Sequence, residues 1–213
     1  MRPSKYISLY SDSNMLKNLE VKALPFRHFI SQGESLPIGI AHEIVALANP
    51  SDLLGDIGSR SDYANRTFLK KDKFPEYSEE LRSFLNHITS KDFSRYCEEY
   101  FGVDLEGSAL RAEVVCDVSG FFQVPPTDVG DKRITWLTYL GDISENGDVG
   151  TDLFNADLSW HSAAPWGFNN ALVFKPGANT FHGFVRTKKI VGLRKVLIIN
   201  FVDNWKDKHE LFE

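Results

Sequence analysis

The sequence is poor in the features that mark several classes of protein. Among its 213 residues it has only two cysteines, Cys97 and Cys116, which form neither a CxxC pair nor a disulfide framework. No apolar run is long enough to span a bilayer, and the first residues lack the apolar core of a signal peptide. We therefore expect a protein of the reducing cytoplasm that has no membrane partner.

Clusters of one charge are also missing. The formal net charge is −5, and no block of lysine and arginine suggests a nucleic-acid surface. Hydrophobic residues make up 42% of the chain and charged residues 25%, which is ordinary for a soluble globular protein. We expect a small-molecule substrate or ligand and no nucleic-acid partner, and the oligomeric state is left open.

No internal repeat, low-complexity tract or long linker divides the chain, which predicts a single domain over residues 1–213. Residues 1–106 are expected to be mainly helical support. One helix is expected to follow Ser35 and to tolerate a proline in its first turn. A second is expected over 78–88, and a third from Ser90 to a closing Gly102.

The residue pattern over 107–204 predicts a β-rich core. Short β-branched and aromatic runs alternate there with Gly, Pro, Asn and Asp, without intervening helices. This spacing favours an antiparallel sandwich or barrel, and hence an α+β chain whose helices buttress one sheet. The expected strands are Arg111–Val118, Gly120–Val124, Arg133–Leu140, Gly150–Phe154, Ala171–Phe174, Thr180–Val185 and Arg194–Val202.

Two residues near the end of this region are candidates for a binding site. The chain has six histidines but no HExxH motif, so each needs a separate reason to be considered. His182 follows a Pro-Gly turn in a strand, and Arg194 begins an apolar strand twelve positions later. A hairpin of this length can bring both side chains into one barrel mouth. There the guanidinium would need an anion such as a bound carboxylate, whereas the alternative is a surface arginine at a strand end.

The order of these residues resembles the prolyl-hydroxylase-like branch of the 2-oxoglutarate/Fe(II) oxygenases. The resemblance covers about half of the chain and runs through Gly120-Phe121, Asp128, Gly150-Thr151, His182 and Arg194. It implies a double-stranded β-helix, or jelly-roll, core with N-terminal helices. It also implies hydroxylation of a small molecule or peptidyl substrate, with Fe(II) and 2-oxoglutarate as cofactors.

The resemblance also assigns roles to individual residues. In this family two histidines and one carboxylate hold iron on one face of an octahedron. By the resemblance, Asp128 is the carboxylate ligand, His182 the distal ligand, and Arg194 the anchor of the cofactor's far carboxylate. Thr138 is a further candidate for a cofactor contact, on the strand face opposite Tyr139.

The first histidine of the family's motif is absent. Pro126 stands in its place, and proline has no atom that can bind a metal. One interpretation is a pseudoenzyme that keeps the fold as a non-catalytic binding or interaction module. A second is a working site that uses Asp128, His182 and a water or unusual ligand. In the third, a distant side chain such as His161 or Gln123 fills the gap.

Overall fold

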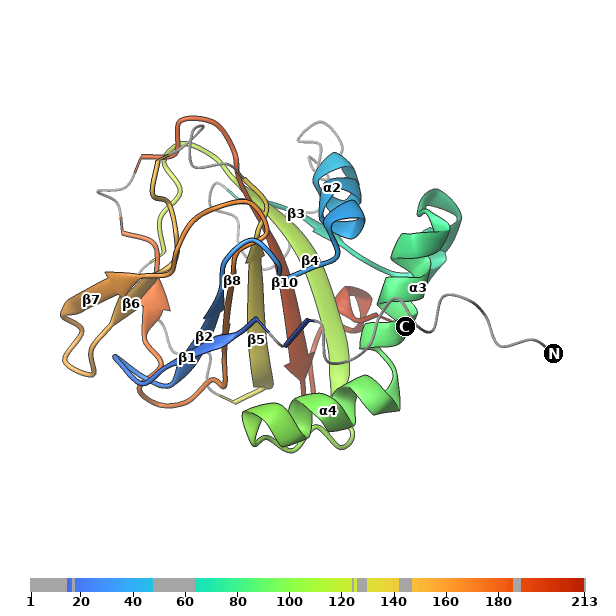
Figure 1. Ribbon diagram of the computed structural model, residues 1–213, viewed down its shortest axis with the longest axis horizontal. Coiled ribbons are helices and arrows are strands. Elements are labelled where there is room, and N and C mark those ends of the chain that lie inside the picture. Colours follow the sequence, from blue (N-terminus) through green and yellow to red (C-terminus); the bar gives the residue numbers. More distant parts are fainter. Residues whose placement is uncertain are drawn as a thin grey trace.

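The fold consists of two facing antiparallel sheets with helices on one outer side. The structure is a computed structural model that describes residues 15–16, 18–47, 64–123, 125, 130–141, 147–185 and 189–212. The large sheet has the strand order β1-β2-β8-β5-β10-β4-β3, and the small sheet has the order β7-β6-β9. Helices α2, α3 and α4 gather on the side of the large sheet away from β6 and β7 (Figure 1). This is the α+β jelly roll that the sequence predicts.

The strands of the large sheet come from both halves of the chain. The interior strand β10 pairs with β4 on one side and with β5 on the other. The strands are β1 (Glu20–Lys22), β2 (His28–Ser31), β3 (Ala64–Phe68), β4 (Ala109–Asp117), β5 (Lys132–Tyr139), β6 (Asp152–Phe154), β7 (Trp160–Ala163), β8 (Ala171–Phe174), β9 (His182–Gly183) and β10 (Arg194–Val202).

The helices begin and end where local chemistry predicts. The Ser78 hydroxyl accepts a hydrogen bond from the Leu81 N–H at 3.0 Å, which caps the N-terminus of α3. Ser90 caps α4 in the same way, and Gly102 ends α4 in the left-handed conformation at φ 65°. The helical elements are α2 (Ile38–Leu47), the 3-10 helix η1 (Lys71–Glu76), α3 (Glu79–Ile88), α4 (Lys91–Phe101) and the 3-10 helix η2 (Lys208–Glu210).

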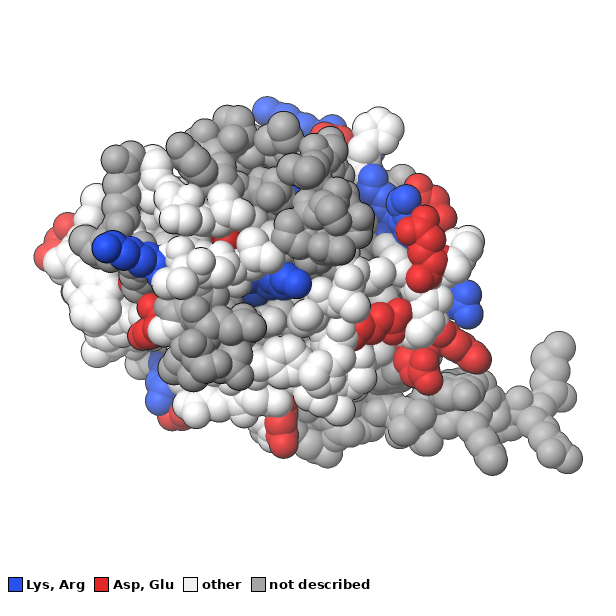
Figure 2. Space-filling view, turned by 90° about the horizontal axis from the view of Figure 1, so that it is seen from above, with Lys and Arg blue, Asp and Glu red and all other residues white. Residues whose placement is uncertain are grey.

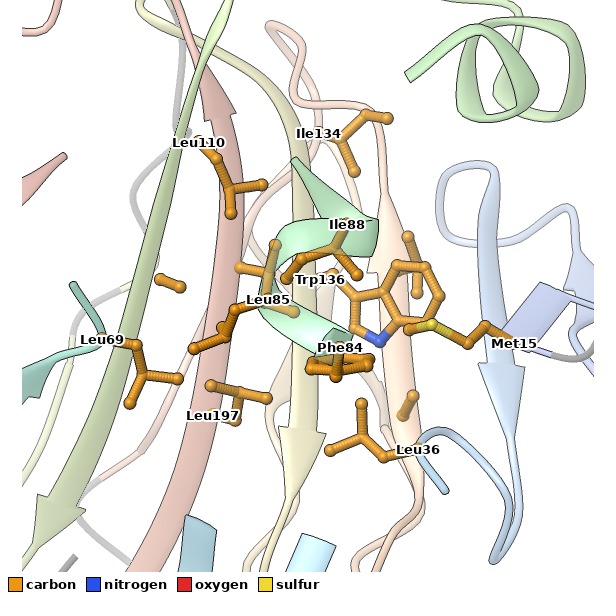
Figure 3. Packing of buried hydrophobic residues seen from close by; sticks show 14 of the residues in the cluster. Met15, Leu36, Leu69, Phe84, Leu85, Ile88, Leu110, Ile134, Trp136 and Leu197 are labelled. Atoms are coloured by element: carbon orange, nitrogen blue, oxygen red, sulfur yellow. The ribbon is translucent and has the colours of Figure 1, made fainter. Parts of the chain in front are cut away.

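The main hydrophobic core lies between the helices and the large sheet. Phe84, Leu85 and Ile88 recur at helical spacing on α3 and are fully buried. They pack toward Trp136 of β5 and Leu197 of β10 (Figure 3). Burying a side chain of this size stabilises the fold by about 1.5–3 kcal/mol, so this face fixes the helices on the sheet.

The opposite face of the large sheet carries polar side chains into the space between the two sheets. Successive side chains of a strand point to opposite faces. The apolar residues of β10 at 197, 199 and 201 therefore face the helices, while Arg194, Val196, Ile198 and Asn200 face the small sheet. On β4 the inward positions are Arg111, Glu113, Val115 and Asp117, all of them buried.

The first half of the chain contains more β-structure than the sequence analysis expects. Strands β1 and β3 form the two edges of the large sheet. Strands β2 and β3 pair with strands far away in the sequence, whereas β1 pairs with the nearby β2. In contrast, the expected strand over 120–124 is represented among the described residues only by an isolated bridge from Gln123 to Phe184. Among the described residues, no helix is both long and apolar enough to cross a membrane.

Candidate functional site

A cavity of about 130 Å³ lies between the two sheets. Its walls are inward side chains of β3, β4, β5 and β10, closed on the other side by β9 and the segment around Gln123. The polar and charged residues that line it are Arg66, Arg111, Glu113, Asp117, Gln123, Lys132, Thr135, Thr151, His182 and Arg194. The structure thus brings His182 and Arg194 into one cavity, as the sequence predicts.

Arg194 lies in this cavity with its hydrogen-bonding groups engaged by the chain. Its Nε donates to the Val149 carbonyl at 2.7 Å, and one terminal nitrogen donates to Thr151 Oγ1 at 3.2 Å. The other terminal nitrogen forms an ion pair with Asp117 Oδ2 at 2.5 Å. Asp117 stands directly opposite Arg194 in the β4–β10 register. The anion that an inward arginine requires is therefore supplied by the protein.

Aromatic side chains enclose the same guanidinium. The Arg194 carbon lies 5.0 Å from the ring centre of Phe184 and 5.8 Å from those of Tyr139 and Trp166. The Tyr139 hydroxyl donates to Thr151 Oγ1 at 2.8 Å. Burial raises the pKa of Tyr139, which keeps this phenol neutral. Low-dielectric walls of this kind strengthen the Arg194–Asp117 attraction.

His182 is oriented by the backbone. Its Nδ1 lies 2.9 Å from the Thr180 carbonyl oxygen, and because a carbonyl only accepts, Nδ1 carries the proton. Its ring centre lies 4.8 Å from that of Phe174, and the residue is buried. In a neutral ring with this tautomer the lone pair is on Nε2, an arrangement in which a histidine can bind a metal.

The described residues do not complete a three-ligand iron site around His182. They contain no group of three or more His, Cys, Asp or Glu residues that could hold a metal ion. Gln123 and Phe184 exchange two backbone hydrogen bonds at 2.8 Å, and continuing this register places Pro125 opposite His182. Pro126, which replaces the family's first histidine, and Asp128, the expected carboxylate ligand, lie outside the described residues. A two-histidine, one-carboxylate site therefore does not fit the donors that are described.

The two substitutes considered for the missing histidine lie in different places. Gln123 lines the cavity together with His182. His161 belongs to β7 and lines a separate groove with His28 and Leu24, so the structure does not bring it to His182. The proximity of His161 also contributes to lowering the pKa of His28, after the larger effect of burial.

Thr138 does not reach the cavity. It shares a face of β5 with Trp136, as expected, but this face points to the helices, where Ser35 Oγ lies 2.8 Å from the Thr138 hydroxyl. The β5 side chains on the cavity side are Thr135, Leu137 and Tyr139. Side chains alternate between the two faces of β5. Because both faces are buried, the sequence does not reveal which of them lines the cavity.

A cluster of buried charges that the sequence analysis missed lies toward the other end of β4. Arg111 donates to Glu113 at 2.6 and 3.0 Å and to Glu210 at 2.7 Å, and Arg66 donates to Glu113 at 2.7 Å. Burial alone would raise the pKa of Glu113, but the two arginines outweigh it and the pKa lies below its usual value. The signal in the sequence is the alternation of Arg111 and Glu113 with apolar residues in one strand.

No family model matches the chain, and no curated protein is similar to it in sequence. Solved structures are similar. A prolyl-4-hydroxylase of Pseudomonas putida has a TM-score of 0.60 at 13% identity, covering 91% of this chain and 99% of that one. A Trichoplax adhaerens prolyl hydroxylase, in complex with a hypoxia inducible factor peptide fragment, has a TM-score of 0.60 at 14% identity, with 83% of each chain covered.

A third similar structure extends the comparison beyond the prolyl hydroxylases. An oxidoreductase of the 2OG-Fe(II) oxygenase family from Burkholderia pseudomallei has a TM-score of 0.52 at 11% identity, covering 95% of this chain and 93% of that one. Identities this low establish the fold alone. The resemblance drawn from the sequence is confirmed at that level: the chain has the fold of the 2-oxoglutarate/Fe(II) oxygenases and is similar to the prolyl hydroxylases among them.

Proposed function

We propose that the chain is a small-molecule-binding pseudoenzyme, which keeps the oxygenase fold and has no turnover dependent on iron and 2-oxoglutarate. The observation that carries this proposal is the buried ion pair between Arg194 and Asp117. By the resemblance, Arg194 would anchor the far carboxylate of 2-oxoglutarate. In this chain a carboxylate of the protein already occupies that guanidinium.

A bound 2-oxoglutarate would have to compete with Asp117. Displacing Asp117 would leave a buried carboxylate without its cation, at a cost of about 3–5 kcal/mol. Keeping it would put two carboxylates beside one guanidinium, two of whose other four N–H groups donate to Val149 and Thr151. Either outcome weakens the binding of this cofactor.

The metal donors support the same proposal. Within the described residues no group of three or more His, Cys, Asp or Glu side chains could hold a metal ion, and Pro125 is the residue that the register places opposite His182. Iron held by fewer than three protein ligands is bound more weakly than iron held by three.

One observation favours a second candidate function, an oxygenase with an altered iron site. The Nδ1–H of His182 is fixed on a backbone carbonyl, which orients Nε2 as in a metal-binding histidine. In this candidate Asp128 supplies the carboxylate, and His182 is the only imidazole ligand.

Titration of the full chain with Fe(II) and 2-oxoglutarate under anaerobic conditions decides between the two. The pseudoenzyme should develop no visible charge-transfer band, and it should form no succinate in air above a protein-free control. A band that saturates at about one iron per chain, is lost in His182→Ala and is accompanied by succinate would establish the oxygenase instead.

The expected partner is a small molecule, because the cavity has a volume of only about 130 Å³. On the face in Figure 2, lysine and arginine side chains are interspersed with acidic and uncharged ones, which does not favour a nucleic-acid surface there. We also propose a reducing compartment, since Cys97 and Cys116 are buried thiols. Burial raises the pKa of Cys116 to about 11, which keeps it protonated. Recovery of the tagged protein outside the cytosolic fraction would contradict this location.

A further inference from the structure

Two histidines line a groove that is separate from the cavity. The groove has a volume of about 450 Å³ and lies between the β1–β2 hairpin of the large sheet and β7, the edge strand of the small sheet. Figure 1 shows these strands at the same end of the molecule. His28 lines the groove from β2, and His161 lines it from β7. Each sheet therefore contributes one imidazole.

The ring of His28 is held in one orientation. Its Nδ1 lies 2.8 Å from the Phe26 carbonyl oxygen, and because a carbonyl only accepts, Nδ1 carries the proton. The Phe26 ring also packs edge-on against it, with 5.6 Å between the ring centres. His28 is only 4% exposed, and in the neutral ring its lone pair is on Nε2. A hydrogen bond of this kind from the other ring nitrogen is what orients a metal-binding histidine.

His161 can supply a second imidazole to the same groove. It is exposed on an edge strand, so its ring can turn toward a ligand without disturbing the core. Its Nδ1 lies 3.0 Å from Ser162 Oγ, a hydroxyl that can accept from Nδ1–H and leave the lone pair on Nε2. His161 is also close enough for its charge to contribute to the lowered pKa of His28. The two rings therefore lie within electrostatic reach of each other.

The other walls of the groove narrow the chemistry of the ligand. Leu24, Ile30 and Pro165 are apolar, and among the described residues Lys22 is the one charged side chain in the walls besides the histidines. Lys22 forms an ion pair with Glu20, so its charge is compensated. No described carboxylate lines the groove, which disfavours hard cations such as Mg²⁺ that prefer oxygen ligands. Neutral imidazole is instead a ligand of Zn²⁺, Ni²⁺ and Cu²⁺.

We propose that His28 and His161 bind a divalent transition metal, with Zn²⁺ as the reference ion, through their Nε2 atoms. The groove has room for the waters that complete the coordination. The metal would join β2 of the large sheet to β7 of the small sheet, and its binding would stabilise the folded chain. Neither histidine lines the cavity around His182, so this site is independent of the proposed function.

Thermal unfolding of the full chain, without a histidine tag, tests the site with three metal ions at neutral pH. Zn²⁺ at about tenfold excess over its Kd is expected to raise Tm by about 3–6 °C. Ni²⁺ should also raise Tm, whereas Mg²⁺ should leave it unchanged. Calorimetric titration supplies the Kd and should show about one Zn²⁺ bound per chain.

Variants of single histidines identify the ligands. His161→Gln is the sharpest test, because this side chain is exposed and its replacement should leave Tm unchanged in the absence of metal. It should weaken Zn²⁺ binding at least about tenfold. His28→Gln should weaken it as much, although it also lowers the starting Tm because the residue is buried. The matched control is His209→Gln, an exposed histidine of η2, which should bind Zn²⁺ like the wild type.

Three results would overturn the inference. The first is a Tm that does not respond to Zn²⁺, and the second is equal Zn²⁺ binding by His161→Gln and the wild type. The third is Zn²⁺ binding that is lost in His182→Gln and kept in His161→Gln, which would place the metal in the cavity. Succinate formation with iron and 2-oxoglutarate would refute the pseudoenzyme but not this site, because the groove contains neither His182 nor Arg194.

Discussion

Replacing Asp117 by alanine tests whether the Asp117 carboxylate is the counterion that neutralises Arg194. The two groups are 2.5 Å apart, and only 8% of the Arg194 side chain and 2% of the Asp117 side chain are exposed, so water screens their attraction weakly. Removing one partner of a buried ion pair costs about 3–5 kcal/mol. In a protein of this size each kcal/mol shifts Tm by about 2–4 °C, so Asp117→Ala should melt about 6–20 °C lower.

A small carboxylate should then replace the missing one. Acetate at about tenfold excess over its Kd contributes about 1.4 kcal/mol, which corresponds to a rise of about 3–6 °C in Tm beyond any rise in the wild type. Scanning calorimetry at pH 7 measures both effects. As a control, Glu76→Ala removes the exposed Lys73–Glu76 pair and should change the stability by less than about 0.5 kcal/mol.

Two results would refute the reasoning about Arg194. One is a loss of less than about 1 kcal/mol in Asp117→Ala, which would mean that Asp117 is not an essential counterion. The other is an equal response of wild type and variant to acetate, which would mean that the guanidinium is already open to external anions. Either result would restore Arg194 as an anchor for a cofactor.

Three further substitutions test other parts of the structure. Glu113 has a lowered pKa in the folded chain, so its contribution is present above the usual value of 4.5 and is lost as the pH falls through the lower folded value. Urea unfolding should show that Glu113→Gln costs about 3 kcal/mol at pH 7 and clearly less at pH 3; an equal cost would contradict this. In Gly183→Ala the new Cβ would lie 2.5 Å from the Gln123 carbonyl oxygen, so calorimetry should show a loss of about 1–3 kcal/mol, whereas Gly177→Ala has only a contact at 3.9 Å. Ser78→Ala removes the cap of α3 and should cost about 1 kcal/mol in urea unfolding; an unchanged midpoint would show that the cap is dispensable.

The elements that sequence reasoning predicted correctly are those with strong local signals. The strand Arg194–Val202 is found with the expected bounds, because its β-branched and apolar run lies between clear turns. The helices α3 and α4 begin at their serine caps and carry the expected apolar stripes. Strands β1, β2 and β3 were missed since each is short, and β2 and β3 depend on partners far away in the sequence.

The site was predictable only in part for a related reason. His182 and Arg194 could be placed in one cavity from the turn and strand pattern between them. Asp117 could not be recognised as the partner of Arg194, because the register of β4 against β10 is a property of the folded sheet. The alternation of β5 predicts which residues share a face, but not whether that face packs on the helices or lines the cavity. Thr138 was therefore assigned to the cavity although its face packs on the helices.

The length of strand β10 sets the distance between the two polar ends of the cavity. Arg194 and Asn200 are six residues apart on one extended strand, which corresponds to a separation of about 20 Å. A molecule of a few carbon atoms at one end cannot touch the other, so substitutions at the two positions should change stability independently. Engineering can therefore change the side chains at one end of the cavity without altering the contacts at the other end.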